Sequence, residues 1–401
     1  MKNQSQSNLK PRSLLDEFRT LRALLFDTDK TMREILFYSS QAQYISYYEG
    51  LLRELVESEK KQVVYLSSDE TDPIFRGEDP GVIPRYSRAL LPLIFPMIDS
   101  SVVVTTIPDL HQYKIKRSFS GVNYLYVFHS LVSTHMMYRP GAFDHFDTLF
   151  CAGPHHAKEI RKLEVLHGLP KKTLHEVGYY RLEKIHKQHR EYVSEKAKQD
   201  AGEKTVLVAP GWHDSNILNT CAEELLQSLI KEGFFVVLRP HPMTIKNSPS
   251  TLERIQAKFS NAANFSLDTE TTSEKYFHRA DVMVSDWSGA ALEYAFGTER
   301  PVLFVDLPRK VYNPEYEKLG IQPLEIRIRD HIGARMAPEQ VARAGSTALD
   351  FIKNEREYRD QIIEARNTSV YNFGRSSIIG REIISNILTR GIQGRMSGPA
   401  G

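Results

Sequence analysis

The chain has 401 residues, of which 41% are hydrophobic and 25% charged, as in ordinary soluble globular proteins and unlike disordered or collagen-like chains. Lys and Arg number 52 and Asp and Glu number 50, so the net charge is +2. This near balance provides no general attraction for nucleic acid, and we predict no nucleic-acid partner. A chain of this length usually holds two or three domains.

The cysteine content and the N-terminal segment indicate the cellular location of the protein. Two cysteines, Cys151 and Cys221, are too few for a disulfide framework, which favours a reducing compartment. The sequence contains no apolar run of about 18 residues, the length that would span a membrane. Its polar first residues lack the apolar centre of a signal peptide. We therefore expect a cytoplasmic protein, with contact to the inner face of the membrane left open.

Residues 1–33 are mostly polar around one amphipathic stretch and are predicted to form an N-terminal helical extension. Short apolar runs then alternate with helical spacing over residues 34–182. The predicted strands of this part are 35–39, 62–68, 101–107, 123–128 and 146–152, and its helices include 42–57 and 154–166. Alternating strands and helices indicate parallel βαβ units, and hence a first Rossmann-like domain.

The alternation stops at residues 183–204, which are strongly charged and are predicted to be a linker or exposed helix between domains. It resumes over residues 205–375, a second Rossmann-like domain. The predicted strands there are 205–210, 234–240, 264–268, 281–286, 301–306 and 326–330, and the helices are 217–231, 251–259, 272–278, 288–297 and 337–367. The chain is predicted to end in a helix over 376–393 and a flexible tail or cloning remnant over 394–401.

The sequence thus predicts an α/β protein with two doubly wound Rossmann-like domains in tandem, which face each other across a cleft. Continuous apolar strands are typical of parallel sheets that helices cover on both faces. Ligands of such sheets bind at the carboxyl ends of the strands, and the space between two domains is a common place for an active site.

The second domain carries the richest of the candidate motifs. A predicted buried strand ends at Ser285 and Asp286, and Ser288 and Gly289 open the following helix. The free N–H groups and the dipole at a helix start favour an anion such as phosphate. Glu293, about one turn into the helix, is placed to reach a ribose hydroxyl. The alternative is that Asp286 or Ser288 only caps the helix and that Glu293 faces solvent.

Two neighbouring strand ends of the same domain also carry polar or aromatic residues. Arg239 and His241 stand at one strand end, in a loop that two prolines restrict. A guanidinium and an imidazole are suited to bind a diphosphate. Pro210 and Trp212 stand at the other, where the indole would either stack on a base or pack in the core.

His129 is the candidate catalytic residue of the first domain. It directly follows a predicted strand and is placed to act as a general base on an acceptor hydroxyl. The alternative is a half-buried imidazole with a packing role. His135, His145, His155 and His156 lie nearby, but their spacing matches no metal motif. We predict neither a metal nor a cofactor.

Residues 120–306 resemble the CDP-glycerol glycerophosphotransferase family, the teichoic-acid primases and polymerases with a GT-B fold. The family has a block with an aspartate, an aromatic residue, two serines and a later acidic residue. It also has a tryptophan-histidine-glycine motif in the first domain. The corresponding residues here are Asp286-Trp287-Ser288-Gly289 with Glu293, and Phe128-His129-Ser130. One family serine is therefore a glycine, and the glycine after the histidine is a serine.

Three further blocks of the family match in part. The strand end with arginine and histidine reads Arg239-Pro240-His241-Pro242. The block of alanine, proline, threonine, tryptophan and arginine reads Ala209-Pro210-Gly211-Trp212-His213. The interdomain block of a glycine and then proline-arginine reads Gly178-Tyr179-Tyr180-Arg181.

The resemblance implies a transferase for cell-envelope polymers such as teichoic acid or capsule polysaccharide. It would move an alditol phosphate such as glycerol phosphate from a CDP-activated donor to a saccharide or lipid-linked acceptor hydroxyl. Attack at the β-phosphorus of CDP-glycerol would release CMP without a metal. The implied catalytic residues are His129, as the base, and His241. The implied donor-binding residues are Arg239, Pro210, Trp212, Ser285, Asp286, Ser288, Gly289, Glu293 and Arg181.

Other functions remain open at this point. One is a GT-B glycosyltransferase that uses a CMP- or UDP-linked sugar, or a sugar-nucleotide epimerase of the same fold. Another is a non-catalytic module that binds a nucleotide sugar. The N-terminal stretch also has two interpretations, contact with an anionic membrane surface or a helix that caps the first domain. Its basic and apolar residues are Lys10, Arg12, Arg19, Arg22, Leu14, Leu15, Phe18 and Leu21.

Overall fold

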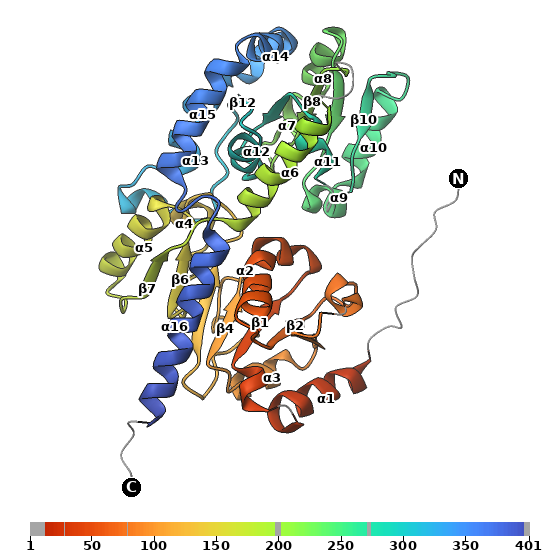
Figure 1. Cartoon of the computed structure of the whole chain (residues 1–401). Helices are drawn as coiled ribbons and strands as arrows, with labels where there is room; N and C mark the ends of the chain where they lie inside the picture. Colours follow the sequence, from red (N-terminus) through yellow and green to blue (C-terminus); the bar gives the residue numbers. More distant parts are fainter. Residues whose placement is uncertain (1–12, 28, 78, 197–201, 271–273, 397–401) are drawn as a thin grey trace.

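The computed structural model describes residues 13–27, 29–77, 79–196, 202–270 and 274–396. The predicted membrane-contact residues Lys10 and Arg12 lie outside this part of the chain. Two sheets, one from each half of the chain, form separate domains that stand one above the other in Figure 1. All strand pairs in both sheets are parallel. The predicted fold class is therefore confirmed.

The first sheet has the strand order β3-β2-β1-β4-β5-β6-β7. Its strands are β1 Ile35–Ser39, β2 Val63–Ser67, β3 Val82–Tyr86, β4 Val102–Thr105, β5 Asn123–Val127, β6 Thr148–Cys151 and β7 Thr173–Glu176. The two edge strands β3 and β7 were not predicted. They are half-exposed and lack a continuous apolar run, and β3 contains Pro84, which edge positions tolerate.

The second sheet has the strand order β10-β9-β8-β11-β12-β13. Its strands are β8 Thr205–Val208, β9 Phe235–Leu238, β10 Phe265–Leu267, β11 Val282–Ser285, β12 Val302–Val305 and β13 Gly333–Met336. The predicted strand at 326–330 is wrong, because these residues lie in the helical turns Leu324–Arg327 and Arg329–His331. The neighbours Ile328 and Arg329 are both buried, which a helical turn permits and an alternating strand with one buried face does not.

Helices cover both faces of the two sheets. Their bounds are α1 Leu14–Arg22, α2 Glu49–Arg53, α3 Leu91–Met97, α4 Thr134–Met137, α5 Pro154–His167, α6 Tyr180–Lys196, α7 Ile217–Thr220, α8 Ala222–Lys231, α9 Pro242–Asn247, α10 Pro249–Lys258, α11 Lys275–Arg279, α12 Ala290–Thr298, α13 Leu324–Arg327, α14 Ala344–Lys353, α15 Glu355–Ser369 and α16 Ser376–Met396. None of the helices in the described part of the chain is both long and apolar enough to cross a bilayer.

The charged segment predicted as a linker is mainly helix α6, which packs along α12 of the second domain. Leu182, Ile185 and His189 form its buried face. A Cβ atom on Gly297 of α12 would lie 2.5 Å from Ile185 Cγ2, so the two helices approach closely there. The charged residues cover the other face of α6. The charged composition of this segment therefore did not reveal that α6 packs on the second domain, because one narrow apolar stripe is enough to hold a helix there.

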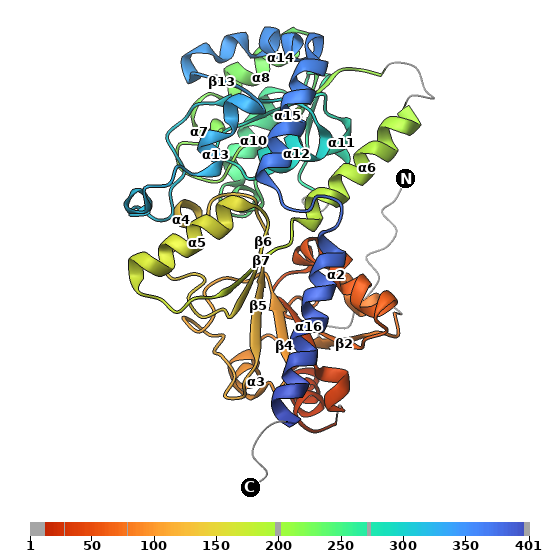
Figure 2. The same ribbon diagram turned by 60° about the vertical axis from the view of Figure 1, so that its left-hand side comes forward.

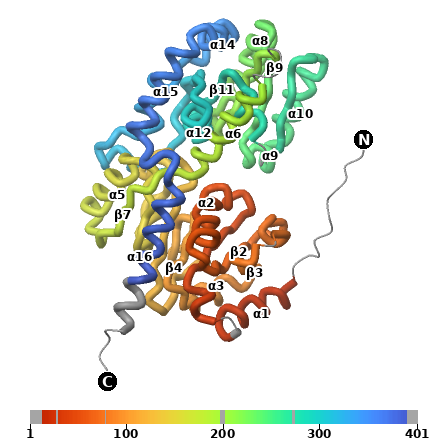
Figure 3. Tube along the Cα trace, in the orientation of Figure 1, coloured from red at the N-terminus to blue at the C-terminus, as the bar shows by residue number. Residues whose placement is uncertain are grey.

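The C-terminal helix α16 returns to the first domain after the second domain is complete. Figures 1 and 2 show α16 running along the first domain beside α2, and Figure 3 shows the chain crossing back between α15 and α16. Ile384 and Leu388 are buried there in one cluster with residues of β1 and β4. Residues 394–396 belong to this helix rather than to a tail, and 397–401 lie outside the described residues.

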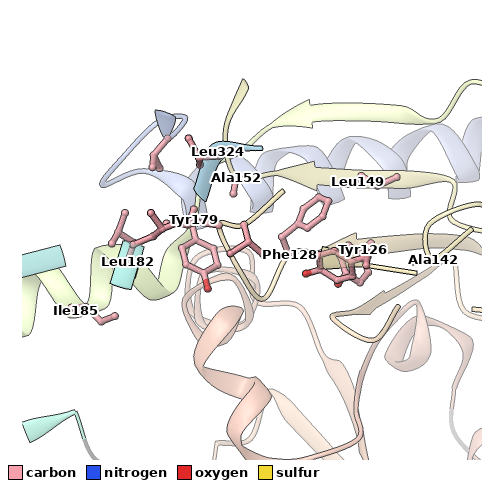
Figure 4. Packing of buried hydrophobic residues seen from close by; sticks show 14 of the residues in the cluster. Tyr126, Phe128, Ala142, Leu149, Ala152, Tyr179, Leu182, Ile185 and Leu324 are labelled. Carbon is pink, nitrogen blue, oxygen red and sulfur yellow. The ribbon is translucent and has the colours of Figure 1, made fainter. Parts of the chain in front are cut away.

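One apolar cluster joins the two domains. It extends from Tyr126 and Phe128 in and after β5, through Tyr179 and Leu182 at the start of α6, to Leu324 of the second domain (Figure 4). The removal of this apolar surface from water holds the two sheets in a fixed relation.

Candidate active site

The strand order reverses between β8 and β11 in the second sheet and between β1 and β4 in the first. Doubly wound sheets bind ligands at the carboxyl ends of the strands beside such a point. The predicted residues after β8 and β11 flank this point of the second sheet. The order of the strands therefore brings together two motifs that are far apart in the sequence.

The Asp286 side chain holds these two strand ends together. Its Oδ1 accepts hydrogen bonds from the backbone N–H groups of Gly211 and Trp287, both at 2.6 Å, and its Oδ2 accepts one from Ile217 at 3.0 Å. Burial alone would raise the pKa of Asp286, but the nearby His213 and these N–H groups hold the pKa below its ordinary value. Asp286 is 1% exposed, so its role here is to shape the site.

Three neighbours of Asp286 are also structural. Ser285 Oγ donates a hydrogen bond of 2.7 Å to the carbonyl oxygen of Ala209 and is buried, as is Pro210. A Cβ atom on Gly211 would lie 2.9 Å from Asp286 Oδ1. Where the family pattern has a threonine, this chain has Gly211, and the Asp286 carboxylate leaves little space for a side chain there. Ser285, Asp286 and Pro210, all predicted to bind the donor, are buried in this structure.

The start of α12 is the anion-suited feature of this sheet. Ser288 Oγ accepts a hydrogen bond of 3.3 Å from the N–H of Ala290. Within the described chain, no hydrogen bond uses the backbone N–H groups of Ser288 and Gly289. These N–H groups and the helix dipole favour a negative charge at this point.

Glu293 and Arg181 are bound to each other rather than left open for a donor. Glu293 accepts hydrogen bonds from Tyr179 Oη at 2.6 Å and from Arg181 Nε at 3.0 Å. Arg181 also pairs with Glu274 at 2.7 Å and donates to Ser46 Oγ of the first domain at 3.3 Å. The contacts of these side chains differ from the predicted contact with a ribose, because both carry charges that are buried and need a partner. They form a brace between the domains.

Arg239 likewise makes protein contacts at the end of β9. Its Nη2 donates to the carbonyl oxygen of Glu270 at 3.1 Å, and its Nε lies 3.8 Å from Asp268 Oδ2. Its guanidinium also lies 5.7 Å from the centre of the Phe277 ring. Burial lowers the pKa of Arg239. The side chain thus ties β9 to β10 and α11 beside the strand end.

His241 presents a defined hydrogen-bond donor. Its Nδ1 accepts a hydrogen bond of 3.1 Å from the N–H of Met243 and so caps α9. Burial and the nearby Lys310 lower the pKa of His241 to about 4, so at neutral pH the proton of the neutral ring is on Nε2. The Trp212 ring stacks near the imidazole with centres 6.4 Å apart. The neutral His241 ring therefore carries an Nε2–H group that can donate a hydrogen bond at this strand end.

His129, at the end of β5, has the opposite tautomer. Its Nδ1 lies 3.0 Å from the carbonyl oxygen of Thr106 and 3.1 Å from Tyr126 Oη. A carbonyl oxygen only accepts, so Nδ1 carries the proton and Nε2 has a free lone pair. Burial lowers the pKa of His129 to about 4, although the bond to Thr106 raises it. The rings of Tyr44 and Tyr47 pack around the imidazole, which is unprotonated at neutral pH.

Three other histidines of the first domain make packing contacts. His135 is buried, with Nε2 3.0 Å from the carbonyl oxygen of Ile321 and Nδ1 3.3 Å from Glu159. His155 and His156 bond backbone carbonyl oxygens of the loop that follows His129. The described residues include no group of three or more His, Cys, Asp or Glu side chains that could hold a metal ion.

The two halves of the candidate site meet directly. A Cβ atom on Gly289 would lie only 3.0 Å from Ser130 Oγ, so the residue after His129 touches the start of α12. Ser133 bonds Glu325 of the second domain through both its N–H and its hydroxyl, at 2.9 and 2.8 Å. The strand end that carries His129 and the anion-suited start of α12 therefore meet at the domain boundary.

Residues 24–320 match the sequence profile of the CDP-glycerol:poly(glycerophosphate) glycerophosphotransferase family. This chain belongs to that family. It is therefore an enzyme of the glycerophosphotransferase family, and the expectation from the sequence motifs is confirmed at this level. No curated protein matches the chain in sequence.

Solved structures support the fold of this glycerophosphotransferase. The wall teichoic acid polymerase TagF is 14% identical, with 94% of this chain and 98% of that chain covered and a TM-score of 0.57. A histidine-to-asparagine variant of TagF soaked with CDPG gives 14% identity, 96% and 100% coverage and a TM-score of 0.59. A putative UDP-N-acetylglucosamine 2-epimerase from Listeria monocytogenes is 10% identical, with 89% and 96% covered and a TM-score of 0.56. At these identities the likeness shows the GT-B-like fold alone.

Two basic residues that lie near Asp286 were not among the candidates predicted from the sequence. Lys310 lies in the loop after β12, and burial lowers its pKa; among the described residues it has no ion pair within 4.0 Å and lies over the Tyr312 ring. Arg329 is 2% exposed, stacks 3.4 Å above the centre of the Trp287 ring and donates to the carbonyl oxygen of Asp286 at 2.6 Å. Arg329 was placed inside the incorrectly predicted strand 326–330, and Lys310 lies a few residues beyond the predicted strand 301–306, so only Lys310 gave a weak signal.

A cavity lies between α5, the loop at 138–144 and the second-domain loop at 313–319. Tyr138 lines this cavity, and its ring also packs on His129 with centres 5.7 Å apart. One side chain therefore separates the cavity from the imidazole.

Proposed function

We propose that this enzyme transfers glycerol phosphate from CDP-glycerol to a hydroxyl group of a saccharide or lipid-linked acceptor. The observation that carries the proposal is the contact between Ser130 and Gly289, which sets the His129 strand end against the start of α12. The family of the chain supports the donor, and the CDPG soak of TagF, a structurally similar protein, agrees with it.

The donor diphosphate would lie at the start of α12. The N–H groups of Ser288 and Gly289 would bind its oxygens, and the Ser288 hydroxyl, whose oxygen accepts from Ala290, would donate its own proton to them. The His241 Nε2–H group would be a further donor. Lys310 adds a positive charge near His241, since it contributes to the lowered pKa of that imidazole. These groups would offset the negative charge of the transferred phosphoryl group without a metal.

His129 would act on the acceptor. Its Nε2 would take the proton of the acceptor hydroxyl as the oxygen attacks the β-phosphorus. A new bond forms between the acceptor oxygen and that phosphorus, and the bond from the β-phosphorus to the bridging oxygen breaks, which releases CMP. The lone pair on Nε2, held by the Nδ1 contact to Thr106, gives the protonation state that a base needs.

Release of the nucleotide tests this function against a sugar transferase of the same fold. The protein is incubated with a lipid-linked saccharide acceptor and with CDP-glycerol, CDP-ribitol, a CMP-sugar or a UDP-sugar in turn. We expect CMP from CDP-glycerol, and a melting-temperature increase with that nucleotide, because a ligand at 100 times its Kd stabilises by roughly 2.7 kcal/mol. Turnover with a UDP-sugar alone, with release of UDP, would contradict the proposal.

We also propose that α1 contacts an anionic membrane surface, which suits a lipid-linked acceptor. Glu17 faces the protein and accepts hydrogen bonds from Ser87 Oγ and from the N–H groups of Arg88 and Leu90. The apolar side chains of the same helix face solvent, with exposed fractions of 58% for Leu14, 68% for Leu15 and 54% for Phe18. A helix that buries an acidic residue and exposes its apolar face suits an interface with lipid.

Sedimentation with vesicles tests the membrane contact. The parent is expected to pellet with phosphatidylglycerol vesicles and to remain in solution with phosphatidylcholine vesicles. Leu15→Ser with Phe18→Ser should abolish the binding, whereas Val165→Ser on α5, a residue with 81% exposure, serves as the matched control. Equal pelleting of the helix variant and the parent would rule out α1 as the contact.

A further inference from the structure

The contact between Ser130 and Gly289 carries an inference beyond the roles of His129 and the helix start. Ser130 Oγ lies 3.0 Å from the place that a Cβ atom of residue 289 would occupy, and Val132 Cγ1 lies 3.5 Å from it. A contact of 3.0 Å is tighter than nine in ten real Cβ contacts. The Ser130 hydroxyl therefore takes up space that a side chain at position 289 would need.

The sequence shows a matching exchange at the same two positions. The family pattern has a glycine after the first-domain histidine and a serine as the second of the pair before α12. This chain has Ser130 and Gly289 instead. Each departure alone removes or adds one hydroxymethyl group. The two residues are in contact. The two exchanges together therefore place the hydroxymethyl group on the first domain instead of the second, at nearly the same point of the site.

We propose that Ser130 donates a hydrogen bond to the diphosphate of the donor, in place of the serine that the family pattern carries at position 289. This rests on the proposed binding of the donor at the start of α12. Ser130 Oγ accepts a hydrogen bond of 3.3 Å from the N–H of Val132, which leaves its own proton to donate. The N–H groups of Ser288 and Gly289, which no hydrogen bond of the described chain uses, would bind the same diphosphate from the other domain.

The exchange has a mechanistic consequence. Ser130 directly follows His129, so its hydroxyl and the base belong to one rigid strand end of the first domain. A donor that binds both Ser130 and α12 therefore lies beside His129, the proposed base. The Ser130 hydroxyl thus favours the arrangement in which both domains hold the substrate.

Four variants test the exchange: Ser130→Ala, Ser130→Gly, Gly289→Ser, and Ser130→Gly with Gly289→Ser. The readouts are the Kd for CDP-glycerol and kcat/KM for CMP release. A hydrogen bond to a charged group corresponds to about 10- to 100-fold, so we expect losses of that size in both Ser130 variants. Gly289→Ser alone should also bind the donor more weakly, because its Cβ atom meets Ser130. The double variant should return close to the parent.

The inference is overturned if both Ser130 variants bind CDP-glycerol like the parent, or if the double variant is no better than Ser130→Gly. Ser288→Ala separates this failure from a failure of the proposed site. Where Ser288→Ala weakens binding and the Ser130 variants do not, the donor site stands and only the exchange is wrong. Where Ser288→Ala also binds like the parent, the donor site itself lies elsewhere.

Discussion

Asp286→Asn removes one charge and one acceptor from a buried carboxylate that three backbone N–H groups share. The amide oxygen can keep the bonds from Gly211 and Trp287, but the amide NH₂ then faces the N–H of Ile217. One buried donor is left unpaired, which costs about 1–3 kcal/mol, and two charge-assisted bonds become neutral ones of roughly half the strength. We expect the second domain to lose about 2–4 kcal/mol of unfolding free energy.

Tryptophan fluorescence reports this loss where it occurs, since the two tryptophans of the chain, Trp212 and Trp287, both lie at the site. Urea unfolding followed at this signal should show a lower midpoint for Asp286→Asn. Asp330→Asn is the matched control, because Asp330 forms an exposed ion pair with Arg335 and such pairs contribute about 0–1 kcal/mol. Equal midpoints for Asp286→Asn and the parent would refute the reasoning.

The pH dependence gives the same prediction a second test. The folded state lowers the pKa of Asp286, so its stabilising contribution is present above the unfolded pKa of about 3.9 and is lost as the pH falls through the folded value. The midpoint difference between parent and Asp286→Asn should therefore be constant from neutral pH down to about pH 5 and shrink below about pH 4. A difference that grows on acidification would contradict the assignment of a charged carboxylate.

Three further predictions concern the rest of the site. His129→Ala should lower kcat by about 10²–10⁴-fold with an unchanged Kd for CDP-glycerol, and near-parental kcat for both this variant and His129→Gln would reject it as the base. His241→Asn keeps an acceptor that can cap α9 but lacks the Nε2–H donor. This variant and Ser288→Ala should each raise the Kd for CDP-glycerol by about 10-fold or more. If calorimetry finds both Kd values unchanged, the donor site lies elsewhere. Arg181→Met leaves Glu293 without its buried charge partner and should lower the free energy of thermal unfolding by about 3–5 kcal/mol. Adding Glu293→Gln to Arg181→Met should recover part of that loss. If the effects of the two substitutions simply add, the two side chains do not act as a coupled pair.

Much of the fold could be predicted from local pattern. Strands such as 35–39 and 302–305 are continuous apolar runs, and a run of that kind is stable only inside a parallel sheet covered on both faces. The errors occur where a tertiary contact overrides the local signal. The charged helix α6 buries a narrow stripe on α12, and Arg329 is buried although it is charged, because Trp287, Phe304 and the Asp286 carbonyl oxygen surround it.

The positions of the candidate residues at strand ends could be predicted from the sequence: His129 follows one buried strand, and His241 and Ser288 follow two others. Those positions follow from short-range pattern, since a residue that follows a buried strand must emerge at the edge of its sheet. Which side chains remain open to a ligand depends instead on the packing of the two domains. Asp286 and Glu293 are engaged by groups distant in the chain, and Ser130 meets Gly289 across two domains. Contacts of this kind depend on how the two sheets pack together, and no local spacing encodes that.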